Sequence, residues 1–135
     1  MSQKEDVMTD ETPSVALTAA TKVYGSADAE VRALDDVTIA FPRGQFTAVM
    51  GPSGSGKSTL LNCMAGLDRL TSGTVEIGGV DLRDLSDRDL TILRRTRLGF
   101  IFQSFNLLPA LTARENITYP LDLSRSRVDP QWFDE

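Results

Sequence analysis

Histidine is absent from this 135-residue sequence, and cysteine occurs once, as Cys63. Histidine is the commonest metal ligand and the commonest general base, and a single cysteine cannot form an internal disulfide. The sequence therefore argues against a zinc site and against serine–histidine catalysis. Cys63 stands among leucines and methionine in an expected helix, which favours a buried small side chain over a reactive thiol.

Long hydrophobic runs are missing as well. The longest nearly uncharged, mostly apolar stretches cover residues 60–67 and 98–102, far short of the ~20 residues that cross a bilayer. The N-terminus lacks the basic start and the apolar block of a secretory signal. We therefore expect no direct membrane insertion, and we expect the chain to stay in the cytosol.

A surplus of positive charge is also missing, because 14 lysines and arginines face 19 acidic residues and leave a net charge of −5. The acidic surplus lies at the two ends of the chain, in residues 1–13 and 122–135. The stretch between them is neutral. Nucleic-acid binders usually show a basic surplus, so we expect no nucleic-acid partner.

The hydrophobic pattern predicts one α/β domain behind a polar tail. Residues 1–13 show no apolar period and are expected to form a disordered acidic tail, which leaves residues 14–135 for the ordered domain. Residues 15–24 and 33–41 alternate as half-buried strands do, and residues 46–50 (FTAVM) have the continuous apolar character of a buried parallel strand.

Later elements are marked by short-range signals. Gly66 suits a helix C-terminus, and the two glycines in residues 74–82 (TVEIGGVDL) predict a hairpin. Residues 98–102 (LGFIF) predict a strand. Two capping boxes predict helix starts on either side of this strand, namely Ser86 with Asp89 and Thr112 with Glu115.

The most informative motif lies between the expected strand 46–50 and an expected helix. Its residues match G-x-x-x-x-G-K-[ST] in the strand-to-helix context that gives this pattern its meaning. Small residues let consecutive backbone N–H groups curl around a phosphate, and the helix N-terminus adds partial positive charge. An ordinary glycine-rich helix cap is the alternative, but it leaves Lys57 and Ser58 unexplained.

We therefore expect a nucleoside triphosphate site in this loop. Lys57 is expected to reach the outer phosphates, and Ser58 to offer its hydroxyl to Mg²⁺. The expected nucleotide-binding residues of the loop are Gly51, Pro52, Ser53, Gly54, Ser55, Gly56, Lys57, Ser58 and Thr59.

Two stretches, MGPSGSGKSTLLNCMAGLDRLTSGTVEIGG and LGFIFQSFNLLPALTARENI, resemble the ATP-binding subunits of ABC transporters. The chain looks most like the branch that serves lipoprotein release, macrolide export and antimicrobial-peptide resistance. This resemblance implies an α/β fold, with a P-loop NTPase core of the ABC ATPase type and an N-terminal antiparallel β-subdomain. It implies ATP and Mg²⁺ as cofactors and ATP hydrolysis as the activity.

The same resemblance assigns roles outside the loop. Gln103 matches the glutamine that contacts Mg²⁺ and the attacking water, which makes it catalytic together with Lys57; a polar residue ending a strand is the alternative. Tyr24 matches the aromatic residue that stacks on adenine, or it is a strand-end tyrosine packed on the core. Residues 104–112 match the surface that receives a short helix of the membrane partner, or they belong equally to the core.

The resemblance also implies partners and missing parts. The partners are a transmembrane permease subunit and a second nucleotide-binding domain in a homodimer, which together place the protein at the inner face of the cell membrane. The family's Leu-Ser-Gly-Gly-Gln-like signature, its Walker B strand ending in Asp-Glu and its switch histidine do not occur in this sequence. The chain is thus expected to be truncated before the signature and Walker B strands, and to be inactive alone.

Two rival classes share part of the pattern. The stretch GPSGSGKSTL also resembles the phosphate loop of guanylate kinases, but those enzymes place the loop near the start of the fold and carry an arginine-rich segment soon after the helix. A non-transport ABC-type ATPase shares every motif found here, and only its partner would distinguish it.

Overall fold

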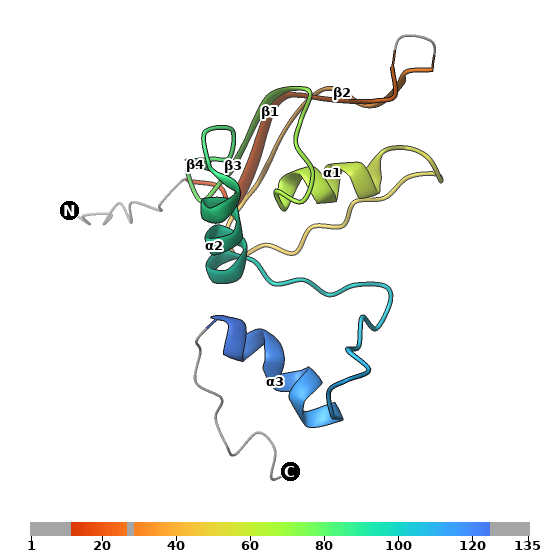
Figure 1. Cartoon of the computed structure of the whole chain (residues 1–135). Helices are drawn as coiled ribbons and strands as arrows, with labels where there is room; N and C mark the ends of the chain where they lie inside the picture. Colours follow the sequence, from red (N-terminus) through yellow and green to blue (C-terminus); the bar gives the residue numbers. More distant parts are fainter. Residues whose placement is uncertain (1–11, 27–28, 125–135) are drawn as a thin grey trace, which may run out of the picture. The chain divides into compact units, whose positions relative to one another are not determined.

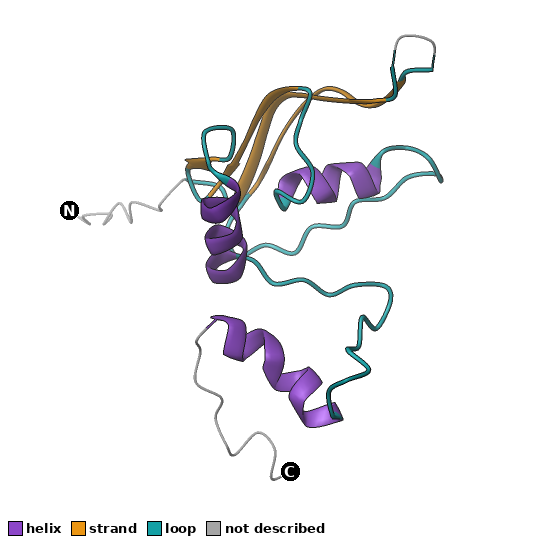
Figure 2. Ribbon diagram, viewed as in Figure 1, coloured by secondary structure: helices purple, strands orange, loops and turns teal. Residues whose placement is uncertain are grey.

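The computed structural model describes residues 12–26 and 29–124. Most of the expected tail, residues 1–11, lies outside this part. The chain divides after Leu90 into two compact units, and each is described by itself. The elements in chain order are β1 (Val15–Tyr24), β2 (Val31–Phe41), α1 (Lys57–Met64), β3 (Ser72–Ile77), β4 (Val80–Asp81), α2 (Asp87–Arg97) and α3 (Ala113–Ser124), as Figures 1 and 2 show.

The described strands form one antiparallel sheet in the order β2-β1-β3-β4. Its central strand β1 pairs on one side with β2, Val15 opposite Phe41, and on the other with β3, Val15 opposite Ile77. The predicted antiparallel β-subdomain is thereby confirmed. The predicted hairpin is confirmed too, because Gly78 and Gly79 take φ values of 55° and 78° between β3 and β4.

A small core fills the space between this sheet and α1, which crosses one face of it (Figure 2). Leu17 and Ala20 are both buried although they are three positions apart, because a shift in the β1–β2 register falls between them. Cys63 of α1 is 1% exposed, and burial raises the pKa of its thiol. The prediction of a buried, unreactive cysteine agrees with this position.

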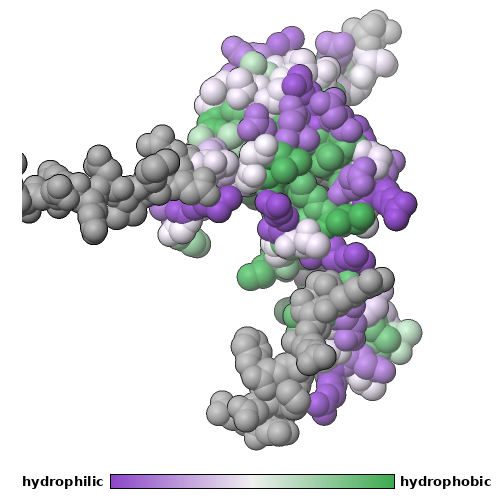
Figure 3. Space-filling view, turned by 90° about the vertical axis from the view of Figure 1, so that its left-hand side faces the viewer, coloured by the Kyte–Doolittle hydropathy of each residue, from purple (hydrophilic) through white to green (hydrophobic). Residues whose placement is uncertain are grey.

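Two of the predicted strands are wrong. Residues 46–50 and 98–102 have no regular secondary structure, and Phe46 and Ile101 are 98% and 103% exposed. A strand forms only where a neighbouring strand accepts and donates its backbone hydrogen bonds. In the described residues the four strands β1, β2, β3 and β4 pair only among themselves, and none of them pairs with residues 46–50 or 98–102. Figure 3 shows one face of the molecule, where hydrophobic surface lies open between polar residues.

Both capping boxes are confirmed. The Ser86 hydroxyl donates to Asp89 Oδ2 at 2.6 Å, and the Asp89 N–H donates back to Ser86 Oγ at 3.2 Å, at the start of α2. At the start of α3, the Thr112 N–H donates to Glu115 Oε2 at 2.7 Å. These hydrogen bonds satisfy helix N–H groups that have no partner within the helix. No helix in the described part of the chain has both the length and the apolar character to span a bilayer.

Candidate functional site

The glycine-rich loop joins residues 46–50 to α1 through Gly56, the N-cap of the helix. Gly56 has φ 84°, in the left-handed region, and a Cβ built on it would lie 2.3 Å from the carbonyl oxygen of Ala33 in β2. Only glycine satisfies both the dihedral angle and the space. The motif's second glycine is therefore the residue that lets the loop press against the sheet.

The N-terminus of α1 carries no side-chain cap. The Leu60 N–H donates to the Gly56 carbonyl at 2.8 Å and closes the first turn of the helix. The N–H groups before it point out of the helix end, where the helix dipole is positive. This end of α1 therefore has the chemistry of an anion-binding site.

Lys57 places a positive charge on the same loop. Its ammonium donates to the carbonyl oxygens of Gly51 at 2.9 Å and Pro52 at 2.6 Å, and to Ser55 Oγ at 3.2 Å. The side chain thus folds back over the loop instead of extending into solvent. Lys57 and the first residues of α1 line the same pocket, and binding of a polyphosphate needs a cation and free N–H groups close together.

An open pocket of about 510 Å³ brings most of the predicted residues together. Tyr24 lines this pocket along with residues 53–59 of the loop and helix, while Gly51 and Pro52 line a neighbouring pocket of about 440 Å³. Residues 31–33 of β2 also line the first pocket, and the sequence did not point to them. They reach the loop through the β1–β2 register, which sets Val31 opposite Tyr24.

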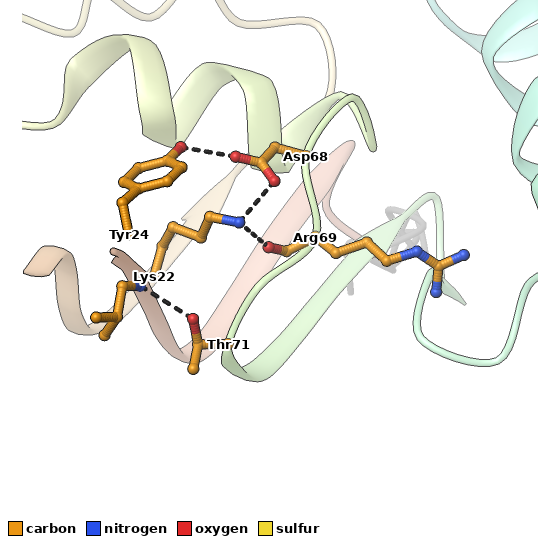
Figure 4. A network of polar contacts seen from close by, with 6 residues as sticks. Lys22, Tyr24, Asp68, Arg69 and Thr71 are labelled. Atoms are coloured by element: carbon orange, nitrogen blue, oxygen red, sulfur yellow. Dashed lines mark hydrogen bonds and ion pairs between the residues drawn. The ribbon is translucent and has the colours of Figure 1, made fainter. Parts of the chain in front are cut away.

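Tyr24 ends β1 with its ring on this pocket and 40% of its surface exposed, so it is no core residue. Its hydroxyl donates to Asp68 Oδ2 at 2.6 Å, and this bond to a carboxylate raises the pKa of Tyr24. The Lys22 ammonium donates to Asp68 Oδ1 at 2.6 Å and lies 4.8 Å from the centre of the Tyr24 ring (Figure 4). These two donors, Lys22 foremost, lower the pKa of Asp68.

Sequence reasoning missed both Lys22 and Asp68. Neither was given a role by any motif, although Asp68 lies within the first stretch that resembles the family, and the two residues are 46 positions apart. The one available signal was the turn at Gly66, which sends the chain back towards the sheet after α1. That turn fixes the direction of the chain and leaves open which strand residue the acid meets.

The remaining predicted residues belong to the second unit. Gln103 lies in an exposed bend, and its contact with Mg²⁺ stays a prediction. Residues 104–112 are exposed apart from the half-buried Leu111, and they frame an open pocket of about 430 Å³ with the start of α3. The segment is thus exposed in the described residues, and its contact with a membrane partner stays a prediction.

Asn116 of α3 holds the end of that segment, residues 108–112, in place, and no sequence pattern indicates this role. Its side-chain amide donates to the carbonyl oxygens of Leu108, Leu111 and Thr112 at 3.2, 3.1 and 2.9 Å. Its carbonyl oxygen accepts from the Leu108 N–H at 2.8 Å. One side chain therefore satisfies several backbone groups of an otherwise irregular loop.

Comparison with known proteins adds independent information. The family model described as "ABC transporter" matches residues 34–135. The macrolide export ATP-binding/permease protein MacB of Hyphomonas neptunium is 47% identical over 108 residues, which are 80% of this chain and 17% of that protein. The lipoprotein-releasing system ATP-binding protein LolD of Anaeromyxobacter dehalogenans is 44% identical over 119 residues, 88% of this chain and 50% of that protein.

A third relative, the ABC transporter ATP-binding protein MJ0796 of Methanocaldococcus jannaschii, is 46% identical over 107 residues, 79% of this chain and 46% of that protein. A solved structure of MJ0796, a dimer in a post-hydrolysis state bound to ADP and Pi, matches with a TM-score of 0.78 at 43% identity, over 87% of this chain and 51% of that one. The chain thus spans at most about half the length of these relatives.

Proposed function

Because the chain belongs to the ABC transporter family, we propose that it binds Mg-ATP as part of a transporter's nucleotide-binding subunit and couples ATP binding and hydrolysis to a membrane permease. One observation carries this proposal. The uncapped end of α1, Lys57 and Tyr24 all line one pocket, which supplies contacts for a polyphosphate and a ring for a base.

The residues of this chain have separable tasks in binding. The loop N–H groups and Lys57 hold the phosphates, and the Tyr24 ring carries the base. Ser58 and Gln103 are the residues that would hold Mg²⁺, which neutralises charge on the phosphates when bound. Among the described residues no cluster of three or more acids, cysteines or histidines could hold a metal.

Hydrolysis needs more than the pocket offers. Among the residues that the structure describes, no carboxylate lines the pocket of Tyr24 and Lys57. Asp35 lines the neighbouring pocket, but it pairs with Arg32 at 2.8 Å. Phosphoryl transfer to water needs a group that orients the water and an acid that holds the metal. We therefore propose that these residues bind and orient ATP, that other elements complete catalysis, and that this chain alone is inactive.

Two relatives support a proposal about the partners. MJ0796 is seen as a dimer, and MacB is named as an ATP-binding/permease protein. For this chain we propose a homodimer of nucleotide-binding domains and a transmembrane permease subunit that holds it at the inner face of the membrane. The exposed segment 104–112, ordered by Asn116, is the proposed contact with that permease.

Direct binding tests the proposal. The protein at its natural length is titrated with a fluorescent ATP analogue, and unlabelled ATP and AMP compete for the site. We expect ATP to displace the analogue far better than AMP, because the loop contributes contacts to the outer phosphates. Equal displacement by AMP would locate the binding energy outside the loop and would contradict the proposal.

The Tyr24 ring gives a second measurable effect. We expect Tyr24→Ala to weaken ATP binding by ~1–3 kcal/mol, or roughly fivefold to 150-fold, because the base loses its stacking partner. Tyr24→Phe keeps the ring for stacking and loses only the hydroxyl, so it is expected to lose less than Tyr24→Ala. GTP should compete measurably, since stacking tolerates any base. Wild-type ATP affinity in both the Ala and the Phe variant would remove Tyr24 from the site.

A further inference from the structure

We infer that Asp68 is a positioning residue for the nucleotide base: it fixes the Tyr24 ring, and Lys22 braces the two together. This inference rests on the proposed function, because it concerns the ring that would carry the base. Asp68 touches no nucleotide in this scheme. It acts through Tyr24, and its effect is therefore confined to the part of the affinity that depends on the base.

Both oxygens of the Asp68 carboxylate are used. Oδ2 accepts from the Tyr24 hydroxyl and Oδ1 from the Lys22 ammonium, each at 2.6 Å. The ammonium makes a further bond to the carbonyl oxygen of Arg69 at 2.7 Å. Hydrogen bonds to charged groups are the stronger ones in proteins. The three side chains form one connected unit, as Figure 4 shows.

The hydroxyl contact matters because the last torsion of a tyrosine is soft. Rotation about the bond from Cβ to the ring has broad, roughly two-fold minima, so the backbone of β1 alone does not set the tilt of the ring. A bond at the far end of the ring does set it. Lys22 covers one face of the ring at 4.8 Å, which leaves the opposite face for a base.

The position of Asp68 is itself fixed by the helix that carries the phosphate loop. At the end of α1 the Gly66 N–H donates to the Cys63 carbonyl at 3.0 Å and the Leu67 N–H to the Asn62 carbonyl at 2.9 Å, the two bonds of a Schellman motif. Gly66 takes φ 64° as this motif requires. The Asp68 N–H also donates to the Asn62 carbonyl, at 3.2 Å.

The chain then returns to β1, which closes the arrangement. The Thr71 N–H donates to the Thr21 carbonyl at 2.8 Å, and the Val23 N–H donates to Thr71 Oγ1 at 3.0 Å. The N-terminus of α1 would face the phosphates, while the hydrogen bonds at its C-terminus fix the position of Asp68. The eight residues of this helix span ~12 Å, so one rigid element relates the phosphate contacts to the tilt of the base platform.

The test separates base from phosphate. The protein at its natural length is prepared as wild type, Asp68→Ala and Asp68→Asn. For each protein, the affinities of ATP and of inorganic tripolyphosphate are measured by displacement of a fluorescent ATP analogue. We expect Asp68→Ala to weaken ATP roughly threefold to tenfold, a part of what a whole base stack contributes, with no change for tripolyphosphate. Asp68→Asn keeps an acceptor for the hydroxyl and is expected to restore most of the ATP affinity.

Two controls accompany these variants. Asp81→Ala removes a carboxylate of similar exposure, 27% against 30%, whose ion pair with Arg83 lies away from this pocket; it should leave both affinities unchanged. In a Tyr24→Phe background, Asp68→Ala should add little, because the hydroxyl through which it acts is gone.

Three results would overturn the inference. Equal losses for ATP and tripolyphosphate would show that Asp68 maintains the fold and does not position the ring. An unchanged ATP affinity for Asp68→Ala would show that the ring is held without it. A wild-type chain that binds neither ligand would overturn the proposed function as well, and this outcome is distinct from the other two.

Discussion

Lys57→Ala is expected to weaken ATP binding at least about tenfold, because charge-assisted contacts to phosphate contribute ~1.5–3 kcal/mol. The Lys57 ammonium already lies on the loop, held by the carbonyl oxygens of Gly51 and Pro52. A phosphate bound by the loop would therefore meet a cation whose position is restricted in advance, which lowers the entropic cost of the contact. Titration of the full chain with a fluorescent ATP analogue measures the change.

Arg95→Ala is the matched control for this variant. It removes an equal charge from an exposed position on α2, so any general effect of net charge on ATP appears in both proteins. Thermal unfolding without nucleotide reports whether Lys57→Ala changes the loop itself. An unchanged dissociation constant for Lys57→Ala would exclude the loop as the phosphate site.

The second large effect concerns the 135-residue polypeptide on its own. We expect it to associate in solution and to show no ATP turnover. Phe46, Met50, Ile101 and Phe105 are 98%, 87%, 103% and 93% exposed, and exposed apolar side chains favour association. Turnover is expected to be absent because, in the described part of the chain, no carboxylate lines the pocket of Tyr24 and Lys57.

Sedimentation measures the association of the 135-residue polypeptide, and an ATPase assay measures its turnover. Both measurements are repeated on a version extended to the length of the relatives. A polar double variant, Phe46→Ser with Ile101→Ser, should associate less than the parent polypeptide, because it removes two of the exposed apolar groups. A soluble monomer that melts cooperatively and hydrolyses ATP as fast as the extended version would refute both parts of the prediction.

Elements specified by neighbouring residues were predictable from sequence. The boxes at Ser86 and Thr112 close within three positions, and the glycines between β3 and β4 supply dihedral angles that other residues avoid. Residues 46–50 and 98–102 were not predictable in the same way. An apolar run indicates that burial is favourable, but strand formation depends on a partner that local sequence does not name.

In the candidate site, too, the residues specified by a contiguous motif were predictable, and those specified by tertiary contacts were not. The loop was recognisable because its glycines, Lys57 and Ser58 are contiguous, and each has its own chemical reason. Tyr24 was found through family resemblance alone. Asp68 escaped notice because its contact with Tyr24 depends on the end of α1 and on the pairing of β1 with β3. Such contacts arise from tertiary structure, and no short pattern encodes them.

The strand order has a consequence for how the chain folds. β1 pairs with β2, its neighbour in sequence, and with β3, which returns only after residues 42–71. The first pairing closes a short connection, whereas the second must close a long one and is entropically slower to form. The glycine-rich loop and α1 lie inside that long connection. A ligand that orders the loop therefore orders part of the connection that must close before β3 can pair with β1. Ligand binding and the pairing of β1 with β3 are thus expected to stabilise each other.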